Sequence, residues 1–153
     1  MTDALTVDVV TEIEIARPRE VVAAFACDPD NAMRWYANIK SAEWVTAPPL
    51  RVGSRIAFVA SFLGSRLDYT YDVQEFVPAE LFVMRTDEGP FPMQTTYEFE
   101  DTPGGGTRMT LRNSGEPKRF SKPSGKLIAG AMRRANRKDL QRLKAVLEGD
   151  VRS

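Results

Sequence analysis

The sequence predicts an α+β domain in which an antiparallel sheet packs against one long C-terminal helix. Residues 124–148 place apolar side chains at three- and four-residue steps, which is the spacing of an amphipathic helix. Residues 39–113 contain short segments rich in β-branched and aromatic residues, separated by glycine and proline turn signals. Because a helix on one face of an antiparallel sheet is a stable layered design, these two observations together predict the fold class.

The first strand is expected at residues 6–15, where apolar and charged residues alternate. One face carries Val7, Val9, Thr11, Ile13 and Ile15, and the other carries Asp8, Glu12 and Glu14. Two short helices should follow this strand. Pro18 suits the first residue of a helix, and Asp28 suits an N-cap with Pro29 directly behind it. The second of these helices carries Trp35 and Tyr36.

Six further strands are expected in the middle of the chain, at residues 41–46, 55–63, 66–73, 81–86, 94–100 and 107–113. Gly64 with Ser65 fits a tight hairpin turn, and residues 104–106 are three glycines that fit the last hairpin loop. Phe76 is out of phase with the strand before it, which predicts a β-bulge near Glu75.

The long helix is expected to face the sheet with one stripe, made of Ile128, Met132, Ala135, Asn136, Leu140, Leu143 and Leu147. The opposite face is basic and carries Arg133, Arg134, Arg137, Lys138, Gln141 and Lys144. Gly149 should end the helix, and residues 117–123 read as a basic, proline-bounded linker before it.

Length and charge predict one soluble domain spanning residues 1–153, with an ordered core at about 6–148. The 21 basic and 21 acidic residues balance, so no nucleic-acid partner is expected. No segment is long and apolar enough to cross a bilayer, and the N-terminus lacks the apolar region of a signal peptide. We therefore expect a cytoplasmic protein without integral membrane association.

The chain contains no histidine and a single cysteine, Cys27. The usual Ser-His-Asp and Cys-His catalytic arrangements therefore cannot form, and neither can ordinary zinc sites or an intramolecular disulfide. Any acid–base chemistry must use Asp, Glu, Lys, Tyr or water. No metal or other cofactor is expected, and Cys27 is expected to be a buried core residue.

Four short motifs, read in order, resemble a known family. They are ARPREVV at residues 16–22, DPDN at 28–31 leading to Trp35 and Tyr36, EFVPAEL at 75–81, and DLQRLK at 139–144. Together they resemble the bacterial polyketide cyclase/dehydrase branch of the START-like, or SRPBCC, superfamily, over nearly the whole chain. The resemblance implies a helix-grip fold, in which a curved sheet wraps around the C-terminal helix and leaves a cavity. It implies little about reaction, since the superfamily includes cyclases, lipid carriers and receptors.

The strand and helix phases predict which side chains would line such a cavity. The expected ligand-binding residues are Phe58, Phe62, Tyr69, Tyr71, Arg85, Thr95, Tyr97, Asn113, Met132 and Asn136. This mixture of apolar, aromatic and a few polar groups is typical of a small-molecule site. The alternative is that the same residues pack as an ordinary core, because a sequence pattern does not measure volume.

Three polar residues in this set have alternative roles. Arg85 follows Leu81 and Val83 in phase and would point inward, where a guanidinium needs an acidic partner or an anionic ligand. The alternative is that the bulge reverses the phase and leaves Arg85 in solvent. Asn113 and Asn136 would hydrogen-bond a ligand, or else bond to backbone and to neighbouring strands.

Tyr69 and Tyr71 are the candidates if the protein is an enzyme. A phenol in an apolar pocket can donate a hydrogen bond to a developing enolate. A cyclase also needs a general base, and Glu75 is the one carboxylate near the right phase. The alternative is that the two tyrosines only buttress the core.

Three functions follow from these residues. The first is a carrier or sensor of a small hydrophobic, lipid- or polyketide-like molecule. The second is an aromatase/cyclase-like enzyme, which requires an ionisable group with a shifted pKa inside the cavity. The third is a protein-interaction module with a filled core, acting through the basic residues 118–122, the basic helix face, or a homodimer contact at Val59 and Leu63.

Overall fold

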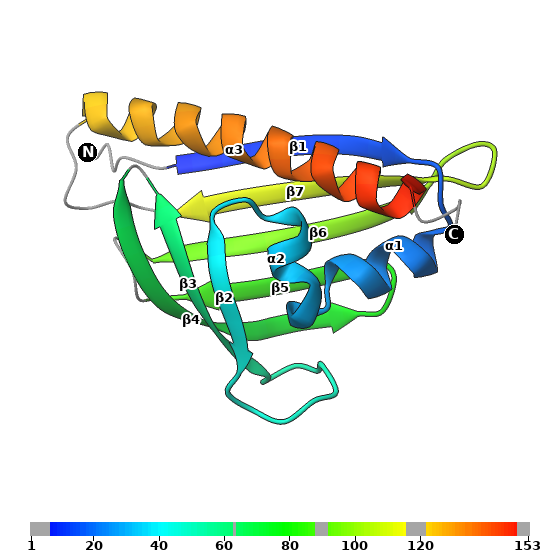
Figure 1. The fold of residues 1–153 in the computed structure, drawn as a ribbon, viewed down its shortest axis with the longest axis horizontal. Helices are drawn as coiled ribbons and strands as arrows, with labels where there is room; N and C mark the ends of the chain where they lie inside the picture. The colour runs from blue at the N-terminus through cyan, green and yellow to red at the C-terminus, as the bar shows by residue number, and fades with distance from the viewer. Residues whose placement is uncertain (1–6, 63, 88–91, 116–121, 150–153) are drawn as a thin grey trace.

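The protein forms a seven-stranded antiparallel sheet with the strand order β1-β7-β6-β5-β4-β3-β2, here in a computed structural model (Figure 1). The structure describes residues 7–62, 64–87, 92–115 and 122–149. The strands are β1 Val7–Ile15, β2 Ile39–Trp44, β3 Arg55–Phe62, β4 Ser65–Val77, β5 Leu81–Thr86, β6 Met93–Asp101 and β7 Thr107–Gly115. The helices are α1 Arg19–Ala26, a 3₁₀ turn η1 Pro29–Asn31, α2 Ala32–Trp35 and α3 Lys122–Gly149.

This arrangement confirms the predicted fold class and element order. The long helix α3 lies along β1 and crosses the concave side of the sheet, and α1 and α2 lie in front of β5 and β6 (Figure 1). The segment 66–77 is one strand, β4, interrupted by the predicted bulge between Val73 and Glu75. No helix in the described part of the chain is long and apolar enough to span a membrane.

Two helix starts differ from the prediction by one or two residues. Pro18 is the N-cap of α1, one position before the first helical residue, and its extended φ and ψ of −61° and 150° fit that place. The helix α3 begins at Lys122 and so includes Pro123, which was expected in the linker. Proline is tolerated in the first turn because the N–H it lacks has no partner there. Residues 117–121 of that linker lie outside the described residues.

The phase predicted for β5 was wrong. Phe82 and Met84 point into the concave side, where Phe82 is paired with Tyr97 and Met84 with Thr95 on β6. Val83 is therefore on the other face, opposite Glu75 on β4. The bulge in β4 explains the difference. Its extra residue shifts the pairing of β4 with β5 by one position, so the inward-facing Val73 is paired with Met84. Met84 and Phe82 therefore face inward on β5.

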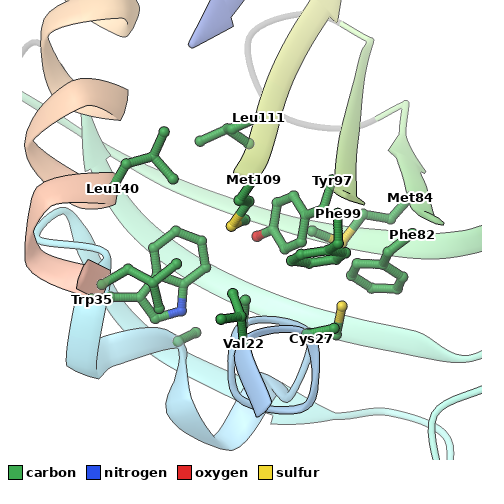
Figure 2. Close-up of a cluster of buried hydrophobic side chains, with 14 of the residues drawn as sticks. Val22, Cys27, Trp35, Phe82, Met84, Tyr97, Phe99, Met109, Leu111 and Leu140 are labelled. Carbon is green, nitrogen blue, oxygen red and sulfur yellow. The ribbon is translucent and has the colours of Figure 1, made fainter. Parts of the chain in front are cut away.

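The short helices α1, η1 and α2 pack on the sheet through a large cluster of aromatic and apolar side chains. Asp28 caps η1 by accepting a hydrogen bond from the backbone N–H of Asp30 at 2.9 Å, as predicted. Trp35 is fully buried and lies edge-on to Tyr97, with ring centroids 5.8 Å apart (Figure 2). Cys27 is buried in the same cluster, and burial raises the pKa of its thiol. This cluster fixes α1 and α2 on the sheet.

The helix α3 packs differently along its length. Near its C-terminus, Leu140, Leu143 and Leu147 are almost completely buried in the large cluster. Near its start, Ile128 and Met132 form a separate small cluster with the β1 residues Val7 and Val9. Between these two clusters the helix presents Ala135, Asn136 and Asp139, and the candidate site lies there.

Candidate functional site

A cavity of about 150 Å³ lies between the middle of α3 and the concave face of the sheet. Its wall is formed by Tyr36, Asn38, Ile39, Phe58, Ala60, Ser61, Leu67, Tyr69, Tyr71, Met84, Thr86, Met93, Thr95, Asn113, Met132, Ala135, Asn136 and Asp139. Most of these side chains are apolar or aromatic, and a few polar groups converge among them. That composition is typical of small-molecule sites, and a cavity of this size can hold an aromatic ring.

One polar feature of the wall is a row of hydrogen bonds that runs from the sheet to the helix. The hydroxyls of Tyr71 and Thr95 lie 2.9 Å apart, and the amide N–H of Asn113 donates to the Thr95 hydroxyl at 2.8 Å. The amide N–H of Asn136 then donates to the Asn113 carbonyl oxygen at 2.7 Å. The row forms because β6 and β7 pair Thr95 directly with Asn113. The bond to Asn113 leaves the Asn136 carbonyl oxygen as an acceptor for a ligand.

An aromatic wall of β3 and β4 residues faces the helix. The rings of Phe58 and Tyr69 are stacked at 5.8 Å, and Tyr69 meets Tyr71 edge-on at 5.4 Å. Burial raises the pKa of Tyr71 to about 12 and also raises that of Tyr69. Both phenols therefore remain neutral near pH 7 and can act as hydrogen-bond donors.

A carboxylate, that of Asp139, lies at the other polar position of the cavity. The residue is 4% exposed, and its Oδ1 accepts a hydrogen bond from the backbone N–H of Ala37 at 3.1 Å. Burial raises the pKa of Asp139 to about 6, although the Ala37 hydrogen bond and the nearby Arg142 oppose that shift. Near neutral pH this group can therefore exchange a proton.

Two phenols lie close to this carboxylate. The hydroxyls of Tyr36 and Tyr97 are 2.5 Å apart, so one donates to the other. Burial raises the pKa of each phenol well above its ordinary value, and the negative charge of Asp139 adds to this effect. The chain between α2 and β2 brings Tyr36 into position, because the Ala37 N–H beside it is bound to Asp139.

The structure brings together seven of the ten predicted ligand-binding residues: Phe58, Tyr69, Tyr71, Thr95, Asn113, Met132 and Asn136 all line the cavity. Tyr97 does not line it and is instead a core residue behind Tyr36. The side chain of Phe62 lies outside the described residues. Both asparagines bond to neighbouring side chains of the wall, while their bonding to a ligand stays a prediction.

Two charged residues considered for the cavity face solvent instead, and for Arg85 this is the second of the two alternatives given above. Arg85 faces away from the cavity, is exposed, and forms an ion pair with Asp87 at 3.3 Å. This follows from the reversed phase of β5, and it avoids burying an unpaired guanidinium. Glu75 follows the bulge in β4 and is also exposed, so it cannot serve as a base in the cavity.

Sequence reasoning missed Asp139 and Tyr36. Asp139 is three residues after Asn136 and four after Ala135, so its position on the inward stripe was visible in the spacing. Charged residues are rarely buried, so spacing alone does not mark this carboxylate as an inward group. Tyr36 follows the end of α2, and no periodic pattern covers that position.

A second hollow of about 500 Å³ lies on the outside of α1, beside residues 48–50. Two of its carboxylates are engaged locally: Asp28 caps η1, and Asp30 accepts a hydrogen bond from the indole N–H of Trp44 at 3.1 Å. In the part of the chain that the structure describes, no three Asp, Glu or Cys side chains are grouped closely enough to hold a metal ion. The inner cavity is therefore the better candidate site.

Solved structures share this fold. The aromatase/cyclase ZhuI from Streptomyces sp. R1128 superposes with a TM-score of 0.82 at 13% identity, covering 97% of both chains. A START superfamily protein from Mycobacterium smegmatis gives 0.78 at 15% identity, covering 93% of this chain and 97% of that one. The protein TTHA0849 from Thermus thermophilus gives 0.77 at 23% identity, covering 90% and 94%.

These structural similarities establish the helix-grip fold. Comparisons of the sequence address the family. No curated protein sequence is detectably similar to this chain. The family model described as "Polyketide cyclase / dehydrase and lipid transport" matches residues 6–148, which is nearly the whole chain. The predicted resemblance to polyketide cyclases and dehydrases is confirmed: this protein belongs to the family that this model describes.

Proposed function

We propose that the protein binds one small, mainly apolar molecule with hydroxyl or carbonyl groups in the cavity under α3. The observation that carries this proposal is the cavity itself, which has a volume of about 150 Å³ and lies between α3 and the sheet. Its mostly apolar and aromatic wall with a few converging polar groups has the composition of a small-molecule site, which supports an occupant of that chemistry. The family and its neighbours share a ligand-binding fold, which supports the same reading.

The wall also indicates how such a ligand would be oriented. Its apolar part would lie against Phe58, Tyr69 and Met84. A polar group would reach the hydrogen-bonded row at Asn136, whose bond to Asn113 holds the amide in one orientation. Because the hydrogen bonds within the row already fix its side chains, the row needs little reorganisation when the Asn136 carbonyl oxygen accepts a bond from the ligand.

The test is to fill the cavity. Ala135 lines it and Ala145 is exposed on the same helix, so Ala135→Trp and its control Ala145→Trp differ mainly in where the indole points. In NMR titrations the wild type and the control should take up the neutral single-ring probe toluene, and native mass spectrometry should detect any molecule that co-purifies. Ala135→Trp should lose both the probe uptake and the co-purifying molecule, while its melting temperature should stay close to that of the wild type. Equal uptake by both variants would contradict a ligand in this cavity.

A second candidate function, cyclisation of a polyketide-like chain, is favoured by Asp139. A cyclase needs a base, and the Asp139 carboxylate borders the cavity with its pKa raised to about 6. In such a reaction the carboxylate would remove a proton from the carbon between two carbonyl groups. A tyrosine hydroxyl would bond to the enolate oxygen while the new carbon–carbon bond forms, and the resulting alkoxide would take up the proton.

This second function is tested by turnover. A linear poly-β-ketone thioester should cyclise faster with the protein than without it, and Asp139→Asn should remove the acceleration. Tyr36→Phe and Tyr71→Phe would distinguish the phenols beside the carboxylate from those in the aromatic wall. If the thioester binds but cyclises no faster than in buffer, the protein is a carrier of such molecules and does not catalyse this reaction.

A further inference from the structure

The charge of the cavity wall is one-sided. Of the described residues that line the cavity, Asp139 is the one that can carry a full charge near neutral pH, and no Lys or Arg is among them. The polar groups around it are neutral amides, hydroxyls and phenols. The positive charges of α3 lie elsewhere, on exposed residues such as Arg134, Arg137 and Lys138. The cavity therefore provides a negative centre and no positive one.

Each packed element contributes a group that faces Asp139, and none neutralises it. Tyr36, which follows α2, and Tyr97 from β6 are buried phenols whose pKa values are raised, so they are uncharged. The Ala37 N–H supplies a hydrogen bond and no charge. Arg142, one turn further along α3, is exposed and attracts the carboxylate only weakly. A buried carboxylate without a cation partner is costly, and a bound cation would remove that cost.

We propose that the cavity selects a ligand with an aromatic or alicyclic body and a protonated amine, which pairs with Asp139, and that it rejects carboxylate ligands of the same shape. This inference rests on the proposed binding function and names the chemical class of its ligand. Charge-assisted hydrogen bonds to a desolvated carboxylate are stronger than neutral ones, which favours the amine. A ligand carboxylate would instead meet a like charge in a poorly solvated space.

The helix positions a second acceptor for the same amine. Asn136 is three residues before Asp139, so their Cβ atoms lie about 5–6 Å apart on one face of α3. An ammonium group has three N–H donors and no acceptor. One donor can reach the Asp139 carboxylate and another the Asn136 carbonyl oxygen, since the Asn136 N–H is already given to Asn113. The ring of such a ligand would then extend toward Tyr69 and Phe58.

The experiment compares three ligands that differ mainly in charge: benzylamine, benzyl alcohol and benzoate. Their dissociation constants are measured by NMR titration of the intact protein. At about pH 8, where Asp139 is ionised because its pKa is about 6, benzylamine should bind at least about tenfold more tightly than benzyl alcohol, and benzoate should bind most weakly. In Asp139→Asn, which keeps the oxygen that bonds Ala37, benzylamine should lose its advantage and benzoate should improve.

The wild-type pH profile provides a check without any substitution. The preference for benzylamine over benzyl alcohol should shrink as the pH falls below about 6, because Asp139 then becomes neutral while the amine stays charged. Equal affinities at about pH 8, tightest binding of benzoate, or an amine preference that survives in Asp139→Asn would each overturn the inference. If none of the three binds while toluene does, the inference fails and the binding function stands. If that probe is also refused, both fail.

Discussion

The two halves of α3 face the same sheet with opposite results. In the C-terminal half, Leu140 and Leu143 are 1% and 0% exposed and belong to the large cluster, where Leu140 lies close to Trp35 and Met109 (Figure 2). In the middle of the helix, Ala135 and the polar Asn136 and Asp139 occupy the equivalent inward positions and leave a cavity. We call the region of Leu140, Leu143 and Leu147 the filled half of α3, and the region of Ala135, Asn136 and Asp139 the hollow half.

This comparison shows that the helix, more than the sheet, creates the cavity. The sheet offers large side chains to both halves: Tyr97 and Phe99 under the filled half, and Tyr69 and Met84 under the hollow half. What changes is the length and polarity of the helix residues opposite them. A curved sheet around one helix can be closed by leucines or left open by shorter residues, and this chain does both.

The largest expected effect comes from opening the filled half. Leu140→Ala should lower the free energy of unfolding by about 3 kcal/mol, because it removes a fully buried side chain and leaves a new void. Met132→Ala, which borders an existing cavity, should cost about half as much. Urea denaturation of both variants measures this difference. Equal losses would mean that the hollow half is packed as tightly as the filled half.

The same addition should have opposite consequences at a filled position on α1 and beside the cavity on α3. Ala26 is 5% exposed in the large cluster, so Ala26→Leu should destabilise the protein by about 2 kcal/mol through overpacking. Ala135→Leu adds the same atoms beside the cavity, and its stability should stay within about 0.5 kcal/mol of the wild type or rise. Thermal melts of both variants test this, and a comparable loss in Ala135→Leu would argue against an open cavity.

The charge in the hollow half should cost stability, and this cost should depend on pH. The pKa of Asp139 is raised from 3.8 to about 6, so its ionised form disfavours the fold above about pH 6. Asp139→Asn should therefore be more stable than the wild type by on the order of 1 kcal/mol at about pH 8, and this gain should disappear as the pH falls from about 6 to about 4. Urea denaturation of both proteins across this pH range measures the gain.

Glu148, on the same helix, provides a control of opposite sign for this profile. The Lys144 ammonium beside Glu148 and the Ala16 N–H hold its pKa below the ordinary value. Glu148→Gln should therefore lose stability at neutral pH, and the loss should fade as the pH falls through the lowered pKa. If Asp139→Asn followed this profile instead, the carboxylate would have to be stabilised by a partner in the fold.

The smallest effect is expected outside both halves. Arg85 lies on the far face of β5 in an exposed ion pair with Asp87, and such pairs contribute little. Arg85→Ala should change the free energy of unfolding by less than about 0.5 kcal/mol and leave probe uptake unchanged. A several-fold loss of uptake would mean that Arg85 contacts the ligand, as expected if Leu81, Val83 and Arg85 faced the cavity.

The third function considered from the sequence receives little support from these regions. A filled core was its requirement, and the hollow half is open. It also expected an exposed apolar patch at Val59 and Leu63, but Val59 is half-buried and Leu63 lies outside the described residues. The basic face of α3 and a homodimer contact stay as predictions.

The sequence by itself determined the order of elements, the inward stripe of α3 and the phases of β1 and β4. Each of these is a repeat of two or of three to four residues within one segment, and such a repeat reports which side of the segment is buried. The tyrosines of β4 and the asparagines of β7 and α3 were found on this basis. The family followed from the order of four local motifs.

Only the tertiary structure decided the phase of β5, the inward position of Asp139 and the pairing of Tyr36 with Tyr97. Both faces of β5 are partly apolar, so its own pattern was ambiguous and the bulge in β4 settled the register from outside the segment. A buried carboxylate opposes local hydrophobicity and is tolerated only where space and neighbours allow it. The volume of the cavity depends on how side chains from distant segments meet, and no local pattern contains that quantity.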